Sequence, residues 1–256
     1  MAKTLKTIKA GRLVYAVVYT TPTIGDGPRV RQQKQHASCE AREKLNARTS
    51  YQKLERLLAA NFDTGDLWVT LTYSDEKLPH SRDRAMQRFQ RFVSNLRKAR
   101  EKRGEPLQYI YVTEGDFPGG RLHHHMVANS TGKDLDEIKQ VWTQGDVEIR
   151  RLTFDAVNTY EQLSVYMTKE PREHGHPKVG EHMWVPSRGL ARPEPETASV
   201  PDYLTLSAPP DAIAIEYQPP TKNGFGEYSW IKYMLPTEKT KKKPRAKRKR
   251  HRKSKE

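Results

Sequence analysis

The most regular pattern of hydrophobic and polar positions runs through Leu67–Tyr73, which reads LWVTLTY. Its leucines, valine and tyrosine fall on one face and its tryptophan and threonines on the other, and this period of two residues predicts a β-strand with one buried face. Stretches rich in β-branched and aromatic residues predict the other strands. These lie at Arg12–Tyr19, Leu107–Thr113, Leu122–Ala128, Asp146–Arg151, Ala212–Tyr217 and Tyr228–Tyr233.

Apolar residues recur at helical spacing along Asp83–Arg103, and Gly104 follows as a stop signal. The stripe consists of Met86, Phe89, Phe92, Val93 and Leu96. Similar spacing predicts helices at Ala37–Ala60, with Ser38 as N-cap, at Asp134–Thr143 and at Asp155–Lys169. The segments 22–35 and 171–210 are rich in glycine, proline and polar residues, so we predict loops there.

The order of these elements defines the fold class. Gly115–Gly120 is a turn between two predicted strands, so these strands should pair as an antiparallel hairpin. A purely doubly wound parallel sheet contains no such hairpin. We therefore predict an α+β fold, in which helices pack on a mostly antiparallel five-stranded sheet. The expected divisions are an N-terminal strand and helix extension (1–60), a core (61–175), a C-terminal extension (176–235) and a disordered basic tail (236–256).

Positive charge is concentrated at the end of the 256-residue chain. The formal net charge is +15. Lys239–Glu256 holds 12 Lys and Arg against one acidic residue, which gives +11 and leaves +4 for the rest. Such a tail attracts a phosphate backbone through counterion release. A solubilising or membrane-surface tail is the alternative, but the near absence of apolar residues in the tail favours nucleic acid over a lipid interface.

Cysteine usage and hydropathy narrow the class further. Cys39 is the only cysteine, which excludes an intramolecular disulfide and a cysteine-based zinc site. No apolar run reaches the ~20 residues that a membrane span needs, and Met1–Lys6 lacks the apolar stretch of a signal peptide. We therefore expect a soluble cytoplasmic protein, in a bacterial host cell if the resemblance described below holds.

Three consecutive histidines mark a candidate metal site on the second strand of the predicted hairpin. Alternation places His123 and His125 on one face and His124 on the other. Glu114 ends the partner strand and could complete a site with two histidines and one carboxylate, with Asp116 in reserve. Imidazole and carboxylate ligands suit Mn²⁺, and oxygen-rich sites suit Mg²⁺. The alternative is a polar surface strand with no metal.

A tyrosine and a lysine on the predicted helix Asp155–Lys169 form the second candidate group. Tyr166 and Lys169 are three residues apart and would be neighbours on one helix face. An ammonium group beside a phenol favours the phenolate. Tyr160 falls on another stripe, with Val157, Leu163 and Met167, and we predict a packing role for it. The alternative for Tyr166 is an ordinary core or rim tyrosine.

Taken in order, these motifs resemble the rolling-circle replication-associated proteins of the HUH endonuclease class. The nearest branch is that of filamentous and microvirus-like single-stranded DNA phages and related bacterial elements. The resemblance covers roughly residues 61–195 and includes TLTY at Thr70–Tyr73, GRLHHH at Gly120–His125 after Glu114, YMTK at Tyr166–Lys169 and SRGLARP at Ser187–Pro193. The chain departs from the pattern at Leu122, where proline is common, and at His124, where a bulky hydrophobic residue is usual. Gln162 replaces a second tyrosine found in some relatives.

The resemblance implies a sheet of the ferredoxin-like or RRM-like type and a nickase that acts on single-stranded DNA at a replication origin. Tyr166 would form a 5′-phosphotyrosine link with support from Lys169, and His123, His125 and Glu114 would hold Mg²⁺ or Mn²⁺. The free 3′-hydroxyl would prime a host DNA polymerase. A host helicase is expected, because the sequence lacks a GxxxxGK[ST] phosphate loop. We expect DNA contacts from Arg121 and from Lys247, Arg248, Lys249 and Arg250.

Several alternatives stay open on the sequence alone. A non-enzymatic module that binds single-stranded nucleic acid could use a similar sheet, but it would not need the histidines and Tyr166 together. An HUH transposase or a relaxase would share the metal chemistry, although relaxases usually place the tyrosine near the N-terminus. A basic structural protein would leave the motifs unexplained. His174, His176 and His182 offer a weaker second metal site in a predicted loop.

Overall fold

The structure is a computed structural model that describes residues 3–20, 40–169, 182–223 and 226–236. Within these ranges the chain forms two antiparallel five-stranded sheets and four α-helices. The α+β prediction is confirmed, and the second sheet goes beyond it. None of the helices in the described ranges has the length and apolar character needed to cross a membrane.

The first sheet carries the predicted hairpin at its centre. Its strand order is β6-β3-β5-β4-β7, and all its printed pairings are antiparallel. The strands are β3 (Leu67–Leu71), β4 (Tyr109–Glu114), β5 (His123–Ala128), β6 (Val147–Arg151) and β7 (Val185–Pro186). Because β5 lies between β3 and β4, side chains from the TLTY, GRLHHH and Glu114 segments meet on neighbouring strands.

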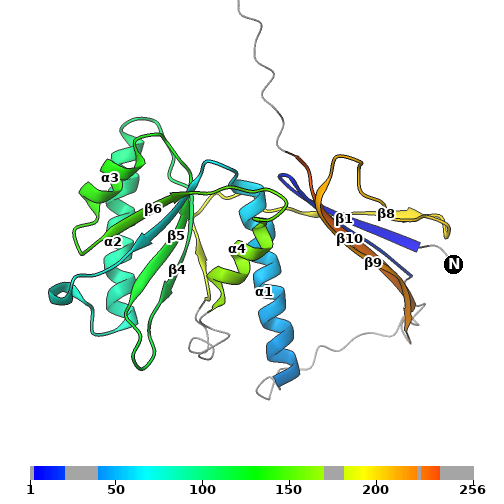
Figure 1. Ribbon diagram of the computed structural model, residues 1–256, viewed down its shortest axis with the longest axis horizontal. Helices are drawn as coiled ribbons and strands as arrows, with labels where there is room; N and C mark the ends of the chain where they lie inside the picture. The colour runs from blue at the N-terminus through cyan, green and yellow to red at the C-terminus, as the bar shows by residue number, and fades with distance from the viewer. Residues whose placement is uncertain (1–2, 21–39, 170–181, 224–225, 237–256) are drawn as a thin grey trace, which may run out of the picture.

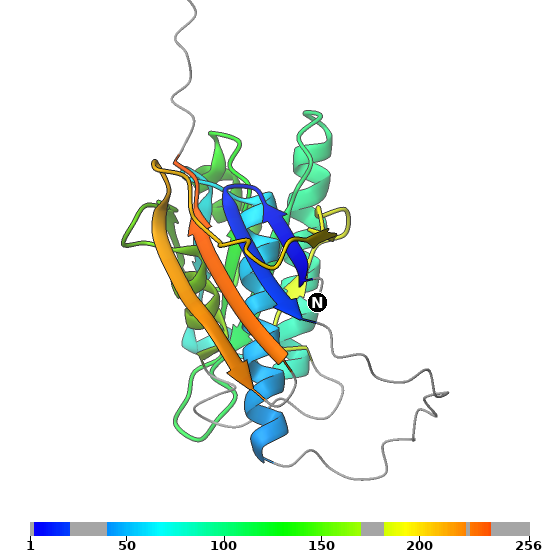
Figure 2. The ribbon, with the colours of Figure 1, turned by 90° about the vertical axis from the view of Figure 1, so that its right-hand side faces the viewer.

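The second sheet joins the two ends of the described chain. Its order is β8-β1-β2-β10-β9. The strands are β1 (Lys3–Ala10), β2 (Leu13–Thr20), β8 (Pro195–Val200), β9 (Ile213–Asn223) and β10 (Gly226–Met234). β2 pairs with β10 along its length, with Tyr19 opposite Tyr228. Figure 2 looks onto this sheet, and the segment that joins β8 to β9 crosses its outer face.

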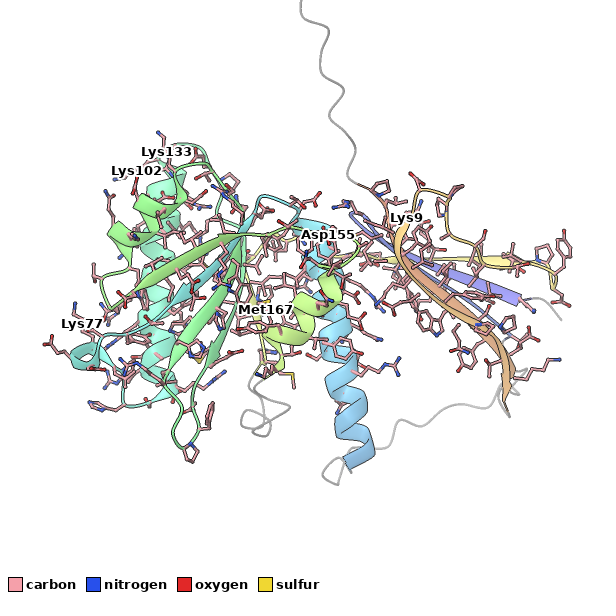
Figure 3. The ribbon with its side chains drawn as sticks, viewed as in Figure 1. Lys9, Lys77, Lys102, Lys133, Asp155 and Met167 are labelled. Carbon is pink, nitrogen blue, oxygen red and sulfur yellow. The ribbon has the colours of Figure 1, made fainter. Side chains whose placement is uncertain are left out.

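The helices separate the two sheets into layers (Figure 1). Two of them, α2 (Arg82–Glu101) and α3 (Asp134–Val141), cover the outer face of the first sheet. The other two, α1 (Glu40–Asn61) and α4 (Tyr160–Met167), pack on its inner face and lie between the sheets. Met167 lies between α4 and the first sheet (Figure 3) and is buried. The inner core therefore fixes α4 against β4 and β5.

A glycine permits the second sheet to approach α1. Gly11 forms the turn between β1 and β2 with φ +54°, a left-handed conformation. A Cβ atom at this position would overlap the Ala59 carbonyl of α1. The neighbouring Ala10 and Leu13 are buried in the inner core, together with Met234 of β10.

Helix caps explain two of the observed helix boundaries. Ser81 accepts a hydrogen bond from the Arg84 amide and starts α2 close to the predicted position. α4 begins later than predicted, at Tyr160, because Thr159 and Gln162 form a capping box. Asp155 instead accepts hydrogen bonds from the backbone of Val157 and Asn158 in a turn. Val157 is consequently 71% exposed and does not share the predicted packing stripe.

Two short strands and several predictions need separate comment. β7 and β8 lie in the segment 171–210, which we predicted to be a loop throughout; that prediction was wrong for these residues. β8 reads PETASV, with five of its six residues exposed, so it carries no alternating apolar signal. The predicted Ser38 cap, the loop at 22–35 and the basic tail from residue 237 onward lie outside the described residues.

Candidate metal and tyrosine site

The strand register brings two histidines and one carboxylate together. Glu114 lies opposite His123 on the paired strands β4 and β5, and His125 follows two residues later on the same face. The Glu114 Oε2 atom lies 3.5 Å from the Nε2 atoms of both His123 and His125. One ligand atom from each residue lies within 4.8 Å of the others, so the group could hold a metal ion.

Hydrogen bonds on the far side of each ring orient the two imidazoles. His123 Nδ1 lies 2.8 Å from the Arg121 carbonyl oxygen and must donate to it, which leaves Nε2 as the unprotonated nitrogen. His125 Nδ1 lies 3.2 Å from the Thr70 hydroxyl. Partners of this kind fix the ring orientation of metal-binding histidines. Both Nε2 atoms therefore face the Glu114 carboxylate.

The charge state of these residues also fits a cation. Burial lowers the pKa of His125 to about 4, despite the opposing effect of the Glu114 carboxylate, so the ring is neutral at pH 7. Glu114 Oε1 is buried and has no hydrogen-bond partner among the described residues. A buried carboxylate oxygen without a partner is costly. A divalent cation at the convergence of these donors would supply the missing interaction.

The reserve carboxylate does not join this group. Asp116 is exposed in the turn between β4 and β5 and is not among the three clustered residues. The turn itself depends on Gly115, which has φ +90°. A Cβ atom at Gly115 would overlap the backbone of Arg121 and Leu122. Glycine at this position therefore keeps Glu114 and His123 in register.

Tyr166 lies beside the histidine pair. Its ring centroid lies 5.7 Å from that of His125, and its side chain is 49% exposed. The hydroxyl has no hydrogen-bond partner within the described part of the chain. An exposed phenol next to a candidate cation site is placed to react with a bound substrate.

Trp68 connects the tyrosine to the metal group, and sequence reasoning did not single it out. Its indole stacks on His125, with ring centroids 4.8 Å apart, and meets Tyr166 at 5.5 Å in an edge-on arrangement. The signal was present in the alternation of Leu67–Tyr73, because Trp68 and Thr70 share the face opposite the leucines. That alternation does not indicate which residues this face meets.

Lys169 lies beyond the end of α4, so its predicted helical spacing from Tyr166 does not hold. The helix ends at Met167, and the C-cap Thr168 has ψ +15°. The Thr168 hydroxyl donates to the Ser164 carbonyl at 2.9 Å, which closes the last turn. Lys169 is exposed, and its role beside Tyr166 stays a prediction.

Tyr160 has the packing role predicted for it. It is 1% exposed, and its ring stacks on Phe154 with centroids 3.8 Å apart. Its hydroxyl donates to the Phe62 carbonyl at 3.0 Å. Burial raises the pKa of this phenol above its ordinary value. Both the hydrogen bond and the raised pKa make Tyr160 a poor nucleophile compared with Tyr166.

His124 points away from the metal group and is fully buried against α2. Its Nε2 lies 2.7 Å from the Tyr73 hydroxyl and its Nδ1 lies 2.9 Å from the Thr113 hydroxyl. A hydroxyl both donates and accepts, so each ring nitrogen is satisfied in either tautomer. Burial lowers the pKa of His124 to about 3. A neutral histidine thus occupies a position where the resembling family usually has a hydrophobic residue.

The predicted DNA-binding residues are only partly described. Arg121 is half exposed; it pairs with Asp75 at 2.8 Å and donates to the Tyr73 carbonyl at 2.6 Å. It therefore tethers the loop after β3 to the strand that carries the histidines. Lys247, Arg248, Lys249 and Arg250 lie outside the described residues, as do His174 and His176 of the weaker second metal site.

One comparison with known proteins links this site to a family. The family model of the replication-associated protein ORF2 matches residues 66–171, a segment that contains Trp68, the metal group and Tyr166. This match supports a replication initiator of the rolling-circle type. No curated protein and no solved structure matches the chain.

Proposed function

We propose that this protein is a metal-dependent nickase that cuts single-stranded DNA at a replication origin through a covalent tyrosine intermediate. The observation that carries the proposal is the contact of Tyr166 with His125, one of three residues able to hold a cation. The family match over the same residues supports a role in replication initiation. A binding module would have no need for this combination.

Three residues would hold the cation, and each is prepared for this role by the fold. Glu114, His123 and His125 converge on one point, and the Arg121 carbonyl and Thr70 hydroxyl orient the rings. When bound there, a divalent ion such as Mn²⁺ or Mg²⁺ would polarise the scissile phosphate as a Lewis acid. The cluster leaves the exposed side toward Tyr166 for the substrate.

The protein's own residues would carry out the transfer. The Tyr166 hydroxyl oxygen attacks the phosphorus and loses its proton, a new O–P bond forms, and the bond from phosphorus to the 3′ oxygen breaks. The leaving 3′ oxygen gains a proton, which yields a free 3′-hydroxyl and a 5′-phosphotyrosine. Lys169 would stabilise the phenolate or the charge on the phosphate. The covalent link conserves the bond energy, so the reverse step can rejoin two ends and close a circle.

The partners follow from this reaction. The substrate is single-stranded DNA at an origin, and the 3′-hydroxyl is a primer for a host DNA polymerase. A host helicase would unwind the duplex. The basic tail, including Lys247–Arg250, would add salt-dependent affinity without sequence preference. Host cytoplasm is the expected location of all these components.

The test combines purified protein, labelled circular single-stranded DNA and Mn²⁺ or Mg²⁺, followed by a denaturing gel. We expect nicked DNA and a protein–DNA adduct that both disappear in Tyr166→Phe and on chelation of the metal. Tyr160→Phe is the matched control, because it removes a buried hydroxyl from the same helix. Binding without cleavage of any candidate origin would favour the non-enzymatic module. An adduct that survives in Tyr166→Phe would assign the chemistry to another tyrosine.

A further inference from the structure

Four aromatic side chains share one face of the second sheet and are not used by the proposed nicking reaction. Tyr19 lies directly opposite Tyr228, and Tyr15 and Trp230 lie on the same face further along β2 and β10. Directly opposite residues on paired strands point to the same side of a sheet, and so do residues two apart. We call Tyr15, Tyr19, Tyr228 and Trp230 the aromatic face.

The aromatic face is turned toward α1 but is only partly covered by it. At one end Leu13 and Met234 are buried in the inner core. At the other end Tyr228 is 37% exposed, and the sheet diverges from α1 in this direction (Figure 1). Tyr15 and Trp230 have ring centroids 6.0 Å apart. The rings thus form a row that becomes more accessible away from the helix.

The charges around this row suit a polyanion. The Arg56 guanidinium of α1 lies over the Tyr15 ring, 5.4 Å from its centroid, and Arg48 of the same helix also interacts with this phenol. Lys6 of β1 lies on the aromatic face opposite Val17. At the open end, the residues that flank Tyr19 and Tyr228 on this face are Thr4 and Thr221, which are uncharged.

The carboxylates near the row are already neutralised. Glu55, Glu161 and Glu216 all pair with the Lys232 ammonium, which lies on the same face between the core and Trp230. This cluster lies toward the buried end of the sheet, and among the described residues the strands present no acidic side chain at the open end of that face. A negatively charged ligand would therefore meet arginine, lysine and aromatic rings there.

We propose that the aromatic face binds single-stranded DNA by stacking bases on Tyr19, Tyr228 and Trp230, as a second contact outside the nicking site. Aromatic rings stack on bases with little sequence preference, and neighbouring cations contact the backbone. The choice of this ligand rests on the proposed function, which supplies a single strand to the protein. A neutral or acidic protein partner would not account for Arg48, Arg56 and Lys6 around the rings.

The arrangement of the two sheets places both contacts on one side of the molecule. The β4–β5 turn next to the metal group and the open end of the β9–β10 hairpin lie toward the same side in Figures 1 and 2, with α1 and α4 between them. A strand held at Tyr166 could continue across this side to the aromatic face. The second sheet would then retain the DNA while the active site cuts or rejoins it.

The experiment measures affinity without any cleavage. Fluorescence anisotropy of a labelled oligothymidylate is recorded in EDTA with the full chain in a Tyr166→Phe background. In this background we expect Tyr228→Ala to raise Kd about fivefold or more, the lower end of alanine effects at base stacks. The salt dependence of binding should keep its slope, because no phosphate contact is removed. Tyr228→Phe should bind like the parent.

Tyr217→Ala is the matched control. Tyr217 is 45% exposed on the adjacent strand β9 and lies opposite Ile231, on the other face of the same sheet. This variant should keep the parental Kd. Tyr228→Leu replaces the alanine variant if thermal unfolding shows that Tyr228→Ala is not folded, because leucine keeps apolar volume without an aromatic ring.

The outcomes separate this inference from the proposed function. Equal affinity of Tyr228→Ala and Tyr217→Ala would overturn the aromatic face as a DNA site, even if nicking is found. A change of self-association in Tyr228→Ala with unaltered DNA affinity would also overturn it and assign the face to a second copy of the chain. Absence of nicking in the gel assay would reject the proposed function but would leave a loss of affinity in Tyr228→Ala as evidence for the face.

Discussion

The indole of Trp68 stacks on the imidazole of His125, with ring centroids 4.8 Å apart and ring planes 27° apart. The same indole also meets Tyr166. One side chain on β3 thus contacts a candidate metal ligand on β5 and the candidate nucleophile on α4. The distance between metal and nucleophile is therefore set by packing as well as by the strand register.

Trp68→Ala should reduce nicking without abolishing it. Loss of the indole frees His125 and Tyr166 to move, and residues that orient metal ligands typically contribute about 10- to 100-fold to activity or metal affinity. Single-turnover nicking rates at saturating Mn²⁺ measure the effect. Trp68→Phe keeps an aromatic ring and should recover most of the rate. An unaltered rate in Trp68→Ala would show that the stack has no role in positioning.

Glu114→Gln should remove the response of the protein to metal. Mn²⁺ that binds only the folded state raises the melting temperature in proportion to its binding free energy. We expect this rise in the wild type and its loss in Glu114→Gln, because the amide supplies no charge to the ion. Asp116→Asn is the control, since this exposed carboxylate lies outside the cluster. An equal rise in all three proteins would place the metal elsewhere.

Lys232→Met should destabilise the connection between α4 and the second sheet. The ammonium pairs with Glu216 at 2.8 Å and Glu55 at 3.3 Å, and also with Glu161 of α4. Removal of one partner leaves partly buried carboxylates without compensation, at a cost of roughly 2–4 kcal/mol. Urea unfolding measures the loss.

Lys222→Met provides the comparison for that variant. Lys222 is on the same sheet, but its side chain is 83% exposed and lies 3.9 Å from Glu227. An exposed pair of this kind contributes at most about 1 kcal/mol. Equal stability of the two variants would mean that the Lys232 cluster does not hold the layers together.

Asp134 should make the fold sensitive to acid. Burial tends to raise the pKa of Asp134, but hydrogen bonds from Thr131, Ser130 and Gly132 outweigh this and lower it. Asp134 also pairs with the buried Arg100 at 3.2 Å. A carboxyl with a lowered folded-state pKa stabilises the protein above its unfolded-state pKa, near ~3.9. That contribution is lost as the pH falls through the folded-state value.

Asp134→Asn should therefore lower the stability at pH 7 by roughly 2–4 kcal/mol. It should also flatten the dependence of stability on pH below about pH 4. Denaturant unfolding at a series of pH values measures both effects. Asp136→Asn, at an exposed position of the same helix, should change neither. The prediction is wrong if Asp134→Asn keeps the steep acid dependence of the wild type.

The hairpin and its metal group could be predicted from the sequence because both depend on local rules. Alternation along β5 places His123 and His125 on one face, and a short turn fixes Glu114 opposite them. His124 shows the limit of this reasoning. Its burial depends on Tyr73 and Thr113, which supply hydroxyl partners from neighbouring strands, and the sequence does not say which residues those strands bring together.

The second sheet could not be predicted as a unit. Its central pairing joins residues as distant as Tyr19 and Tyr228, and nothing local in either segment specifies the other. β8 showed no signal because an exposed edge strand needs no apolar face. The boundaries of α4 were misjudged because its capping box competes with a turn at Asp155. The position of Tyr166 next to His125 then follows from how that shortened helix packs through Met167.

The most direct measurement is the identification of the atom that carries the DNA. The adduct formed in Mn²⁺ on single-stranded origin DNA would be digested with protease and nuclease and analysed by mass spectrometry, and the released strand would be offered to a DNA polymerase. We predict a nucleotide joined through its 5′-phosphate to the peptide that contains Tyr166, and a released strand that the polymerase extends from its 3′-hydroxyl. A nucleotide attached to any other residue, or cleavage with no attached nucleotide, would contradict the account.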